Sequence, residues 1–170
     1  MMIFKDIVTS YKTIADKIPD FSKNITGGDL NGLTTRNGRL EGQTHPETGI
    51  PYERKTVETH KGENVDGVFP VFDSKFDANL PEILFKSSDS QQFKESNRQL
   101  KEWVDNNPDE ARNIFDTEQL EDIARGRTPE GCTWHHSEEK GVMQLVDTEV
   151  HAKTGHTGGK TIWGGGNENR

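Results

Sequence analysis

Apolar residues recur at helical spacing over residues 4–18, and the pattern stops before Pro19. This spacing predicts an amphipathic N-terminal helix, with packing or linking as its expected role rather than membrane binding. Residues 22–31 are polar and rich in glycine, which indicates a linker or an exposed loop. A module boundary is therefore expected near Leu33.

Short alternating stretches follow the boundary and predict β-structure. Asn37 and Gly38 lie between two such stretches and can supply the positive φ angles of a tight turn, so a β-hairpin is predicted there. Residues 44–55 are dense in proline and glycine. Residues 68–72 could form a strand that is broken at Pro70, because proline cannot donate a backbone hydrogen bond.

The middle of the chain returns to helical spacing. A helix over 88–103 carries apolar residues on one face, and Ser88 or Asp89 can serve as its N-cap. Pro108 ends this helix and suits the first turn of a second one. A third helix is predicted over 117–126, capped at its first residue. This region is expected to be a helical scaffold.

Alternation of period two reappears near the C-terminus. Residues 133–136 and 142–146 are predicted strands, joined by a polar segment of hairpin length. Asp147 or Thr148 can then cap a short helix that ends at Gly155. The order is strand, turn, strand, helix, and the fold class of the whole chain is predicted to be α+β.

Composition limits the chain to one modest core and leaves its charge unfavourable for a nucleic-acid partner. Only 29% of the 170 residues are hydrophobic, the mean hydropathy is −0.91 and the formal net charge is −8. Proteins that bind nucleic acid usually present an excess of lysine and arginine. Over residues 127–170, however, five Lys and Arg accompany six Asp and Glu, so a bound divalent cation would make this part positive.

A single cysteine, Cys132, excludes an intramolecular disulfide. No apolar run reaches transmembrane length, and the first residues lack the uninterrupted apolar stretch of a secretory signal. We therefore expect a soluble protein or a piece of one.

Four of the six histidines fall within the C-terminal strand-strand-helix unit: His135, His136, His151 and His156. Histidine is the commonest metal ligand and titrates near neutral pH. His151 and His156 have a spacing at which a helix residue and a residue just past the helix end can bind one ion. Adjacent strand residues face opposite sides, so either one of His135 and His136 is idle or the two have different roles. In the second case His135 is a ligand and His136 a general base.

Two alternatives to a catalytic metal site remain open. The histidines could close a structural zinc site with Cys132, which precedes His135 at C-x2-H spacing, or they could be scattered surface residues. Cys132 is expected to be a core residue, and His45 and His60 are expected to face solvent. Glu138 and Glu139 are expected at a solvated edge, since they would repel phosphate. The absence of H-E-x-x-H disfavours a zinc protease.

Candidate substrate-binding residues flank the histidines. Trp134 and Trp163 could stack on bases, although a role in walling the metal unit is the expected one. Lys160 follows two glycines, and this short segment offers backbone amides and a cation to a phosphate. Arg127 and Lys160, with Trp134, are therefore the predicted contacts to substrate.

A known family matches these residues. The segment TPEGCTWHHSEEKGVMQLVDTEVHAKTGHTGG resembles the WHH branch of the HNH/endonuclease VII superfamily, with its Trp-His-His triplet, Met-Gln-Leu-Val strand and His...Gly-His-x-Gly-Gly pattern. The upstream segment GRLEGQTHPETGIPY is similar to one that precedes this unit in the C-terminal nuclease domains of bacterial polymorphic toxins of the LXG or contact-dependent type. The resemblance covers roughly Leu33 to the end.

The resemblance implies a ββα-metal finger of treble-clef-like form on a helical scaffold with short β-hairpins. Residues 1–32 would then be an N-terminal helix and linker, and residues 33–170 a nuclease toxin domain whose core is about 127–163. It also implies that His136 is the general base. The superfamily's middle Asn is missing, and Gln144 is the nearest amide that could orient that base. The implied metal ligands are His135, His151 and His156.

The implied activity is metal-dependent endonucleolytic hydrolysis of phosphodiester bonds, with DNA favoured over RNA. Imidazole ligands favour zinc or nickel by affinity, whereas magnesium or manganese could support turnover. The resemblance implies that a producing bacterium secretes the domain as part of a larger toxin, that it acts in the target-cell cytoplasm, and that a cognate immunity protein neutralises it. The acidic charge suggests that this immunity partner need not be highly acidic. The alternative function is a non-catalytic, zinc-stabilised binding module.

Overall fold

The structure, a computed structural model, describes residues 32–169. The predicted N-terminal helix and linker therefore lie outside the described residues, and the boundary near Leu33 stays a prediction. None of the helices in the described part of the chain combines the length and the apolar character needed to cross a bilayer.

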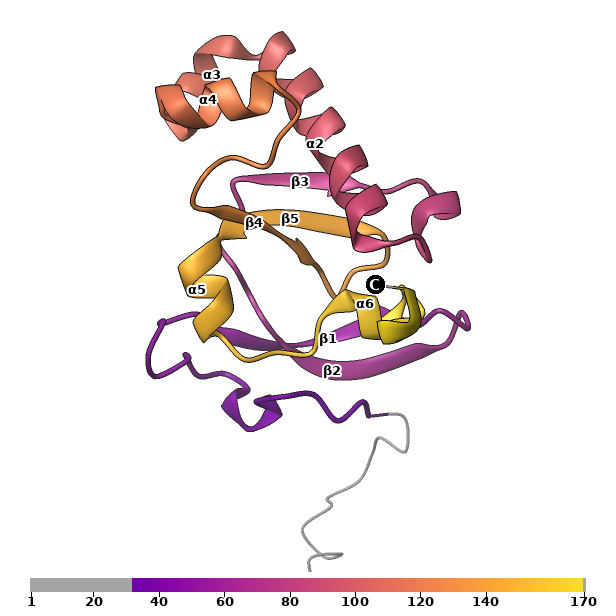
Figure 1. The fold of residues 1–170 in the computed structure, drawn as a ribbon. Coiled ribbons are helices and arrows are strands. Elements are labelled where there is room, and N and C mark those ends of the chain that lie inside the picture. The colour runs from indigo at the N-terminus through magenta and orange to yellow at the C-terminus, as the bar shows by residue number, and fades with distance from the viewer. Residues whose placement is uncertain (1–31, 170) are drawn as a thin grey trace, which may run out of the picture. The chain divides into compact units, whose positions relative to one another are not determined.

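The described residues form an α+β fold built on two small antiparallel sheets (Figure 1). One sheet pairs β1 with β2, and the other has the order β3-β5-β4. The sheet strands are β1 (Tyr52–Glu58), β2 (Asn64–Pro70), β3 (Phe76–Asn79), β4 (Cys132–His136) and β5 (Val142–Asp147). The α-helices are α2 (Asp89–Asn106), α3 (Pro108–Ile114), α4 (Thr117–Ala124), α5 (Thr148–Lys153) and α6 (Gly159–Ile162), and the short 3-10 helices are η2 (Gly38–Leu40), η3 (Glu82–Leu84) and η4 (Gly166–Asn169).

The three helices of the predicted scaffold are confirmed. Ser88 caps α2 through a capping box with Gln91, and α3 starts at Pro108. The cap of α4 is Asp116, one residue before the predicted position, because its carboxylate accepts the backbone N–H of Gln119 at 2.8 Å. Figure 1 shows α2 running alongside the β3-β5-β4 sheet, with α3 and α4 at its far end.

The predicted strand-turn-strand-helix unit is also confirmed. β4 and β5 form an antiparallel hairpin in which His135 lies opposite Gln144 and Trp134 opposite Leu145. The carboxylate of Asp147 accepts the backbone N–H of Val150 at 2.8 Å and caps α5. The third strand of this sheet, β3, was not predicted, and neither were β1 and α6.

The predicted hairpin at Asn37 and Gly38 is wrong. Asn37 does take a positive φ of 64°, but Gly38 begins η2 instead of completing a hairpin turn. The side-chain amide of Asn37 donates to the carbonyl of Gly155 at 2.8 Å, and the flanking chain makes isolated bridges to β1 and β2. This segment is thus held by distant parts of the chain. The strand predicted over 68–72 begins earlier, at Asn64, and ends at Pro70.

The two faces of β4 pack against different neighbours, and this arrangement positions the site. Trp134 is 3% exposed, and its indole N–H donates to Asn97 of α2 at 2.8 Å. His135 points to the opposite face, where it meets His151 of α5 and the ring of Phe72. Consecutive residues of one strand therefore serve a hydrophobic core and a polar cluster. The core also holds Leu100, Ile123, Met143, Leu145 and Trp163.

Candidate metal centre and catalytic cavity

Three histidines from separate elements converge, as predicted. His135 comes from β4, His151 from α5, and His156 from the segment between α5 and α6. One potential ligand atom from each lies within 4.8 Å of the other two. The closest approach is 3.2 Å, between Nδ1 of His135 and Nε2 of His151. Among residues 32–169 this cluster is buried or half-buried, so the alternative of scattered surface histidines is wrong.

Backbone contacts orient the third imidazole. Nδ1 of His156 donates to the carbonyl of Thr154 at 2.7 Å, which leaves the lone pair on Nε2. Thr154 is itself buried and held by its hydroxyl contacts to Val150 and Thr48. A hydrogen bond on one ring nitrogen that fixes the other for coordination is the usual support of a metal-binding histidine.

Phe72 closes the histidine cluster on one side. Its ring centroid lies 4.8 Å from that of His135, 5.3 Å from His156 and 5.5 Å from His151. The ring is buried and excludes water from this side of the cluster. Phe72 was not predicted as a site residue, because an apolar segment such as 68–72 has the same sequence pattern whether it packs in a hydrophobic core or beside a metal centre.

Burial keeps the cluster histidines uncharged. Burial, followed by the neighbouring His156 and His151, holds the pKa of His135 well below its usual value. Burial and the nearby His156 lower the pKa of His151 to about 4, and burial is the main cause that lowers the pKa of His156. Neutral imidazole is the form that binds metal ions, so the cluster is ready to coordinate at neutral pH.

The cluster fits a divalent cation. Two nitrogens bound to one tetrahedral ion at roughly 2.0–2.1 Å lie about 3.3 Å apart, close to the 3.2 Å approach of His135 and His151. Cys132 faces the other side of β4, where it packs against the core, as expected of a core residue.

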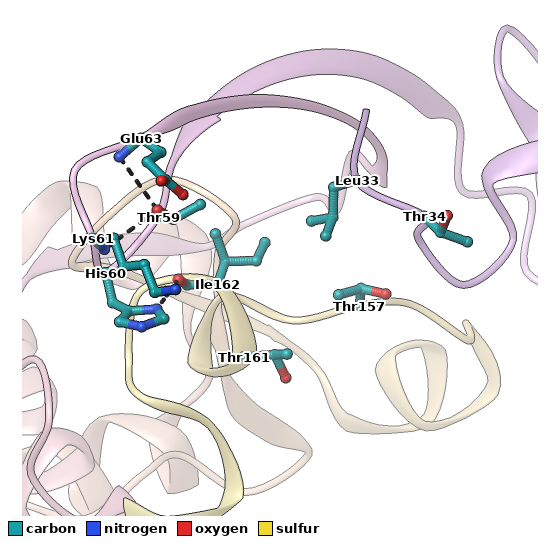
Figure 2. A pocket seen from close by; sticks show the side chains of 9 residues that line it. All are labelled: Leu33, Thr34, Thr59, His60, Lys61, Glu63, Thr157, Thr161 and Ile162. Carbon is teal, nitrogen blue, oxygen red and sulfur yellow. Dashed lines mark hydrogen bonds between the residues drawn. The ribbon is translucent and has the colours of Figure 1, made fainter. Parts of the chain in front are cut away.

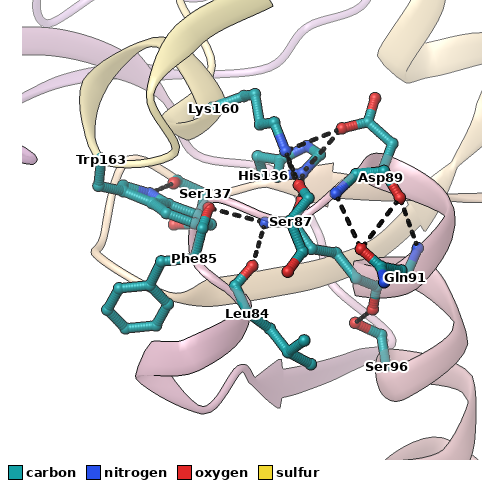
Figure 3. Close-up of polar contacts among 12 residues, drawn as sticks. Leu84, Phe85, Ser87, Asp89, Gln91, Ser96, His136, Ser137, Lys160 and Trp163 are labelled. Atoms are coloured by element: carbon teal, nitrogen blue, oxygen red, sulfur yellow. Dashed lines mark hydrogen bonds and ion pairs between the residues drawn. The ribbon is translucent and has the colours of Figure 1, made fainter. Parts of the chain in front are cut away.

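His136 faces away from the three-histidine cluster and contacts α2. Its Nε2 lies 2.8 Å from Oε1 of Gln92 and 3.7 Å from a carboxylate oxygen of Asp89. The ammonium of Lys160 lies 2.9 Å from the same Gln92 oxygen and 3.2 Å from Asp89. Figure 3 shows Lys160, His136 and Asp89 gathered at the start of α2. Neither Gln92 nor Asp89 was predicted as a site residue.

The three-histidine cluster and His136 border the same cavity. This cavity has a volume of about 260 Å³. It is therefore a space in which a bound group could reach a cation and His136 at once. The lining residues are Trp134, His135, His136, His151, His156, Gly158 and Lys160.

Of the predicted substrate contacts, Trp134 and Lys160 border the cavity but are buried, and Arg127 lies elsewhere. Trp134 is buried and bonded to Asn97, so it walls the unit, as expected, and cannot stack on a base. Lys160 is 2% exposed and its ammonium is surrounded by protein acceptors. Arg127 pairs with Asp122 at the end of α4 and does not line the cavity. None of the three presents a free contact group to a substrate.

Gln144 does not lie where an orienting amide is needed. It is paired with His135 across the hairpin, and its side chain therefore points to the face opposite His136. The amide that contacts His136 comes instead from Gln92, 44 residues earlier in the chain. The geometry thus favours Gln92 over Gln144 for this position.

The predictions of solvent exposure for the other acidic residues and histidines have different outcomes. Glu138 was expected at a solvated edge but is buried, where Lys55 of β1 neutralises it, whereas Glu139 is exposed. His45 is half-buried and accepts backbone N–H groups of its own loop. His60 is exposed and lines a separate cavity of about 380 Å³ next to Ile162 (Figure 2).

Comparison with known proteins identifies the family. The model of the family described as the DNase/tRNase domain of colicin-like bacteriocin matches residues 61–158, more than half of the chain. No curated protein and no solved structure matches the chain. The matched segment contains all four histidines of the site together with α2, and it agrees with the predicted resemblance at the level of a nuclease toxin domain. The chain therefore belongs to the family of DNase/tRNase domains of colicin-like bacteriocins.

Proposed function

We propose that the chain is a metal-dependent endonuclease of the HNH superfamily, and that the β4-β5-α5 unit is its ββα-metal finger. The observation that carries this proposal is the convergence of three neutral imidazoles beside a cavity that a fourth histidine also borders. The family match supports a nucleic-acid substrate. DNA is the favoured substrate, although the family description names both DNase and tRNase activities.

His135, His151 and His156 are the proposed ligands. Three protein ligands leave coordination positions open, as in catalytic rather than structural metal sites. A divalent cation held here would polarise the scissile phosphate and stabilise the departing oxygen. Zinc and nickel suit the imidazole ligands best, and magnesium or manganese could support turnover.

His136 is the proposed general base. It lies on the cavity wall and removes one proton from a water molecule as the water oxygen attacks phosphorus. The new P–O bond forms while the bond to the departing sugar oxygen breaks, and the proton on His136 is returned to solvent before the next turnover. Such proton transfer contributes typically about 10²–10⁴-fold to a rate.

Arg36 is the proposed contact to the nucleic-acid backbone. Its backbone N–H donates to Thr157 at 2.9 Å, and its guanidinium packs so tightly on Gly155 that a Cβ there would lie 2.6 Å from Nε. Arg36 is exposed, and within residues 32–169 no carboxylate pairs with it. The other cations around the site, Lys55, Lys153 and Lys160, each pair with a carboxylate.

The alternative function, a closed zinc-stabilised binding module, has less support. It requires a fourth protein ligand, and the candidate Cys132 points away from His135. It also leaves the cavity beside His136 without a role. Retention of zinc by Cys132→Ser would argue further against this alternative.

The proposed biological setting is competition between bacteria. We infer that the domain is the toxic part of a larger secreted protein of the WHH or polymorphic-toxin type, that it acts in the cytoplasm of the target cell, and that a cognate immunity protein protects the producer. The family description, a domain of colicin-like bacteriocin, supports this setting.

Incubation of the purified chain with supercoiled plasmid and with total RNA, each with a divalent metal and with an excess of chelator, tests the proposal. We expect cleavage of plasmid in the metal-containing samples and none with chelator. Cleavage that persists unchanged in chelator would refute metal dependence. The lack of cleavage of either nucleic acid with zinc, nickel, magnesium and manganese would refute the nuclease function.

A further inference from the structure

A buried polar cluster joins the start of α2 to α6 behind His136. Gln92 is fully buried, and Lys160 is 2% exposed. Neither residue lies within the strand-strand-helix unit that carries the histidines, because Gln92 belongs to α2 and Lys160 to α6. Burial of an amide and an ammonium is unfavourable unless their hydrogen-bonding groups are satisfied, so the contacts of both groups indicate what they do.

The amide of Gln92 can adopt only one orientation. Its Nε2 donates to the backbone carbonyls of Leu84 at 2.8 Å and of Phe85 at 2.9 Å. Its Oε1 accepts from the ammonium of Lys160 at 2.9 Å. The reversed amide would place its oxygen against two carbonyls and its NH2 group against an ammonium, which has no acceptor. Oε1 therefore faces His136.

The position of Lys160 is fixed in the same way. Besides Gln92, its ammonium donates to the carbonyl of Ser87 at 2.6 Å, and a carboxylate oxygen of Asp89 lies 3.2 Å away. The two oxygens of Ser87 and Gln92 accept hydrogen bonds from the ammonium, and the Asp89 carboxylate lies close enough to form an ion pair with it. Lys160 thus holds the Gln92 oxygen in place, and because it is 2% exposed it is not available to a phosphate.

These contacts determine the tautomer of His136. Oε1 of Gln92 can only accept a hydrogen bond, and it lies 2.8 Å from Nε2 of His136. Nε2 must therefore carry the proton in the neutral ring, and the lone pair must be on Nδ1. We infer that Gln92 and Lys160 are positioning residues that hold His136 protonated at Nε2, so that Nδ1 is the nitrogen that takes the proton from water.

This inference rests on the proposed role of His136 as general base, and it names residues that act through that base. A spectroscopic test needs no variant: the full chain, labelled with ¹⁵N and loaded with Zn²⁺, is examined by NMR at a pH well above the ordinary imidazole pKa of about 6.5. We expect a directly bonded proton on Nε2 of His136 and none on Nδ1, with the resonance assigned by its loss in His136→Ala. A proton on Nδ1 would overturn the inference, even if the chain is an active nuclease.

A pair of matched variants provides the kinetic test. Gln99 lies two turns further along α2, and its amide also makes two hydrogen bonds to backbone, both with Asn79. Gln92→Ala and Gln99→Ala therefore remove the same side chain from the same helix, but only Gln92 touches His136. For Gln92→Ala we expect kcat on plasmid to fall about 10–100-fold, with KM and Zn²⁺ affinity nearly unchanged.

Gln99→Ala is expected to retain kcat within about twofold, whatever stability it loses. An equal fall of kcat in the two variants would overturn the positioning role, as would a loss confined to KM. If Gln92→Ala does not fold, the tautomer of the wild-type chain still decides the question. A wild-type chain that cleaves no nucleic acid contradicts the proposed function instead, so the two failures are distinguishable.

Discussion

Two adjacent residues of β4, His135 and His136, lie in different chemical environments. The side chains of His135 and His136 leave β4 on different faces, so one imidazole joins the buried three-histidine cluster while the other meets Gln92. The cluster histidines are kept neutral by burial. In the proposed mechanism the local environment, and not the residue type, therefore distinguishes the three histidines that would bind a cation from the one that would accept a proton.

The neutral cluster predicts how the metal-free protein responds to acid. The folded-state pKa of His151 is lowered from about 6.5 to about 4, so the folded protein binds fewer protons than the unfolded chain between these values. The stability due to this histidine is fully present above about pH 6.5 and is lost as the pH falls towards about 4. In excess chelator, thermal unfolding should show a steeper fall of Tm over this range for the wild type than for His151→Asn. Identical pH dependence of the two proteins would contradict the account.

At the scale of elements, local signals explain which parts of the fold were predictable. The helices α2 and α5 have strong N-caps in Ser88 and Asp147, and α3 starts at a proline, so each carries its own start signal in the sequence. The strand β3 has no such signal, since its partner β5 lies far along the chain, with Phe76 paired to Leu145. The pairing of strands that are distant in the sequence cannot be predicted from the local periodicity of apolar residues.

The site residues also fall into two groups, those that could be predicted from the sequence and those that could not. The four histidines lie within one short strand-strand-helix unit, and their spacing together with the family resemblance predicted that three of them meet. Phe72, Gln92 and Arg36 come from distant segments that only tertiary packing brings to the histidines. Lys160 was predicted from its neighbouring glycines to contact phosphate, but packing against α2 buries it instead.

The packing of α6 on the β4-β5 turn depends on one glycine. A Cβ at Gly159 would lie 1.8 Å from the carbonyl oxygen of Ser137 and 2.3 Å from the indole nitrogen of Trp163, whereas a Cβ at Gly158 meets nothing closer than 3.7 Å. Gly159→Ala should therefore lower the free energy of unfolding by about 1–3 kcal/mol, since overpacking forces the backbone to move. Gly158→Ala, the adjacent control, should change it by no more than about 0.5 kcal/mol. Urea unfolding in chelator measures both, and equal stability of the two variants would contradict this packing.

At the scale of the whole molecule, charge is the main obstacle to nucleic-acid binding. The chain carries a net charge of −8, and most of its cations near the site are neutralised by carboxylates. A cation bound by the three histidines, together with Arg36, would provide local positive charge on an acidic protein. Binding to phosphates would then be concentrated near the three-histidine cluster rather than spread over a basic surface.

Arg36 can be tested against a neighbour of the same type. With metal chelated so that no cleavage occurs, the affinity for a labelled DNA duplex is measured at increasing salt concentrations. Arg36→Gln should weaken binding and reduce the slope of log K against log salt by about 0.9, the value for one lost phosphate contact. Arg39→Gln removes an exposed arginine only three residues away and should leave the slope nearly unchanged. Equal slopes for the two variants would exclude Arg36 as the phosphate contact.

The central claim, that three histidines hold a cation for chemistry performed with a fourth, is tested most directly by His136→Ala. Metal content and plasmid cleavage are measured on the same preparations of the wild type, His136→Ala and the control His60→Ala. We predict about one metal ion per chain in all three proteins, and cleavage at least about 100-fold slower in His136→Ala alone. Cleavage by His136→Ala at the wild-type rate, with its metal retained, would contradict the account.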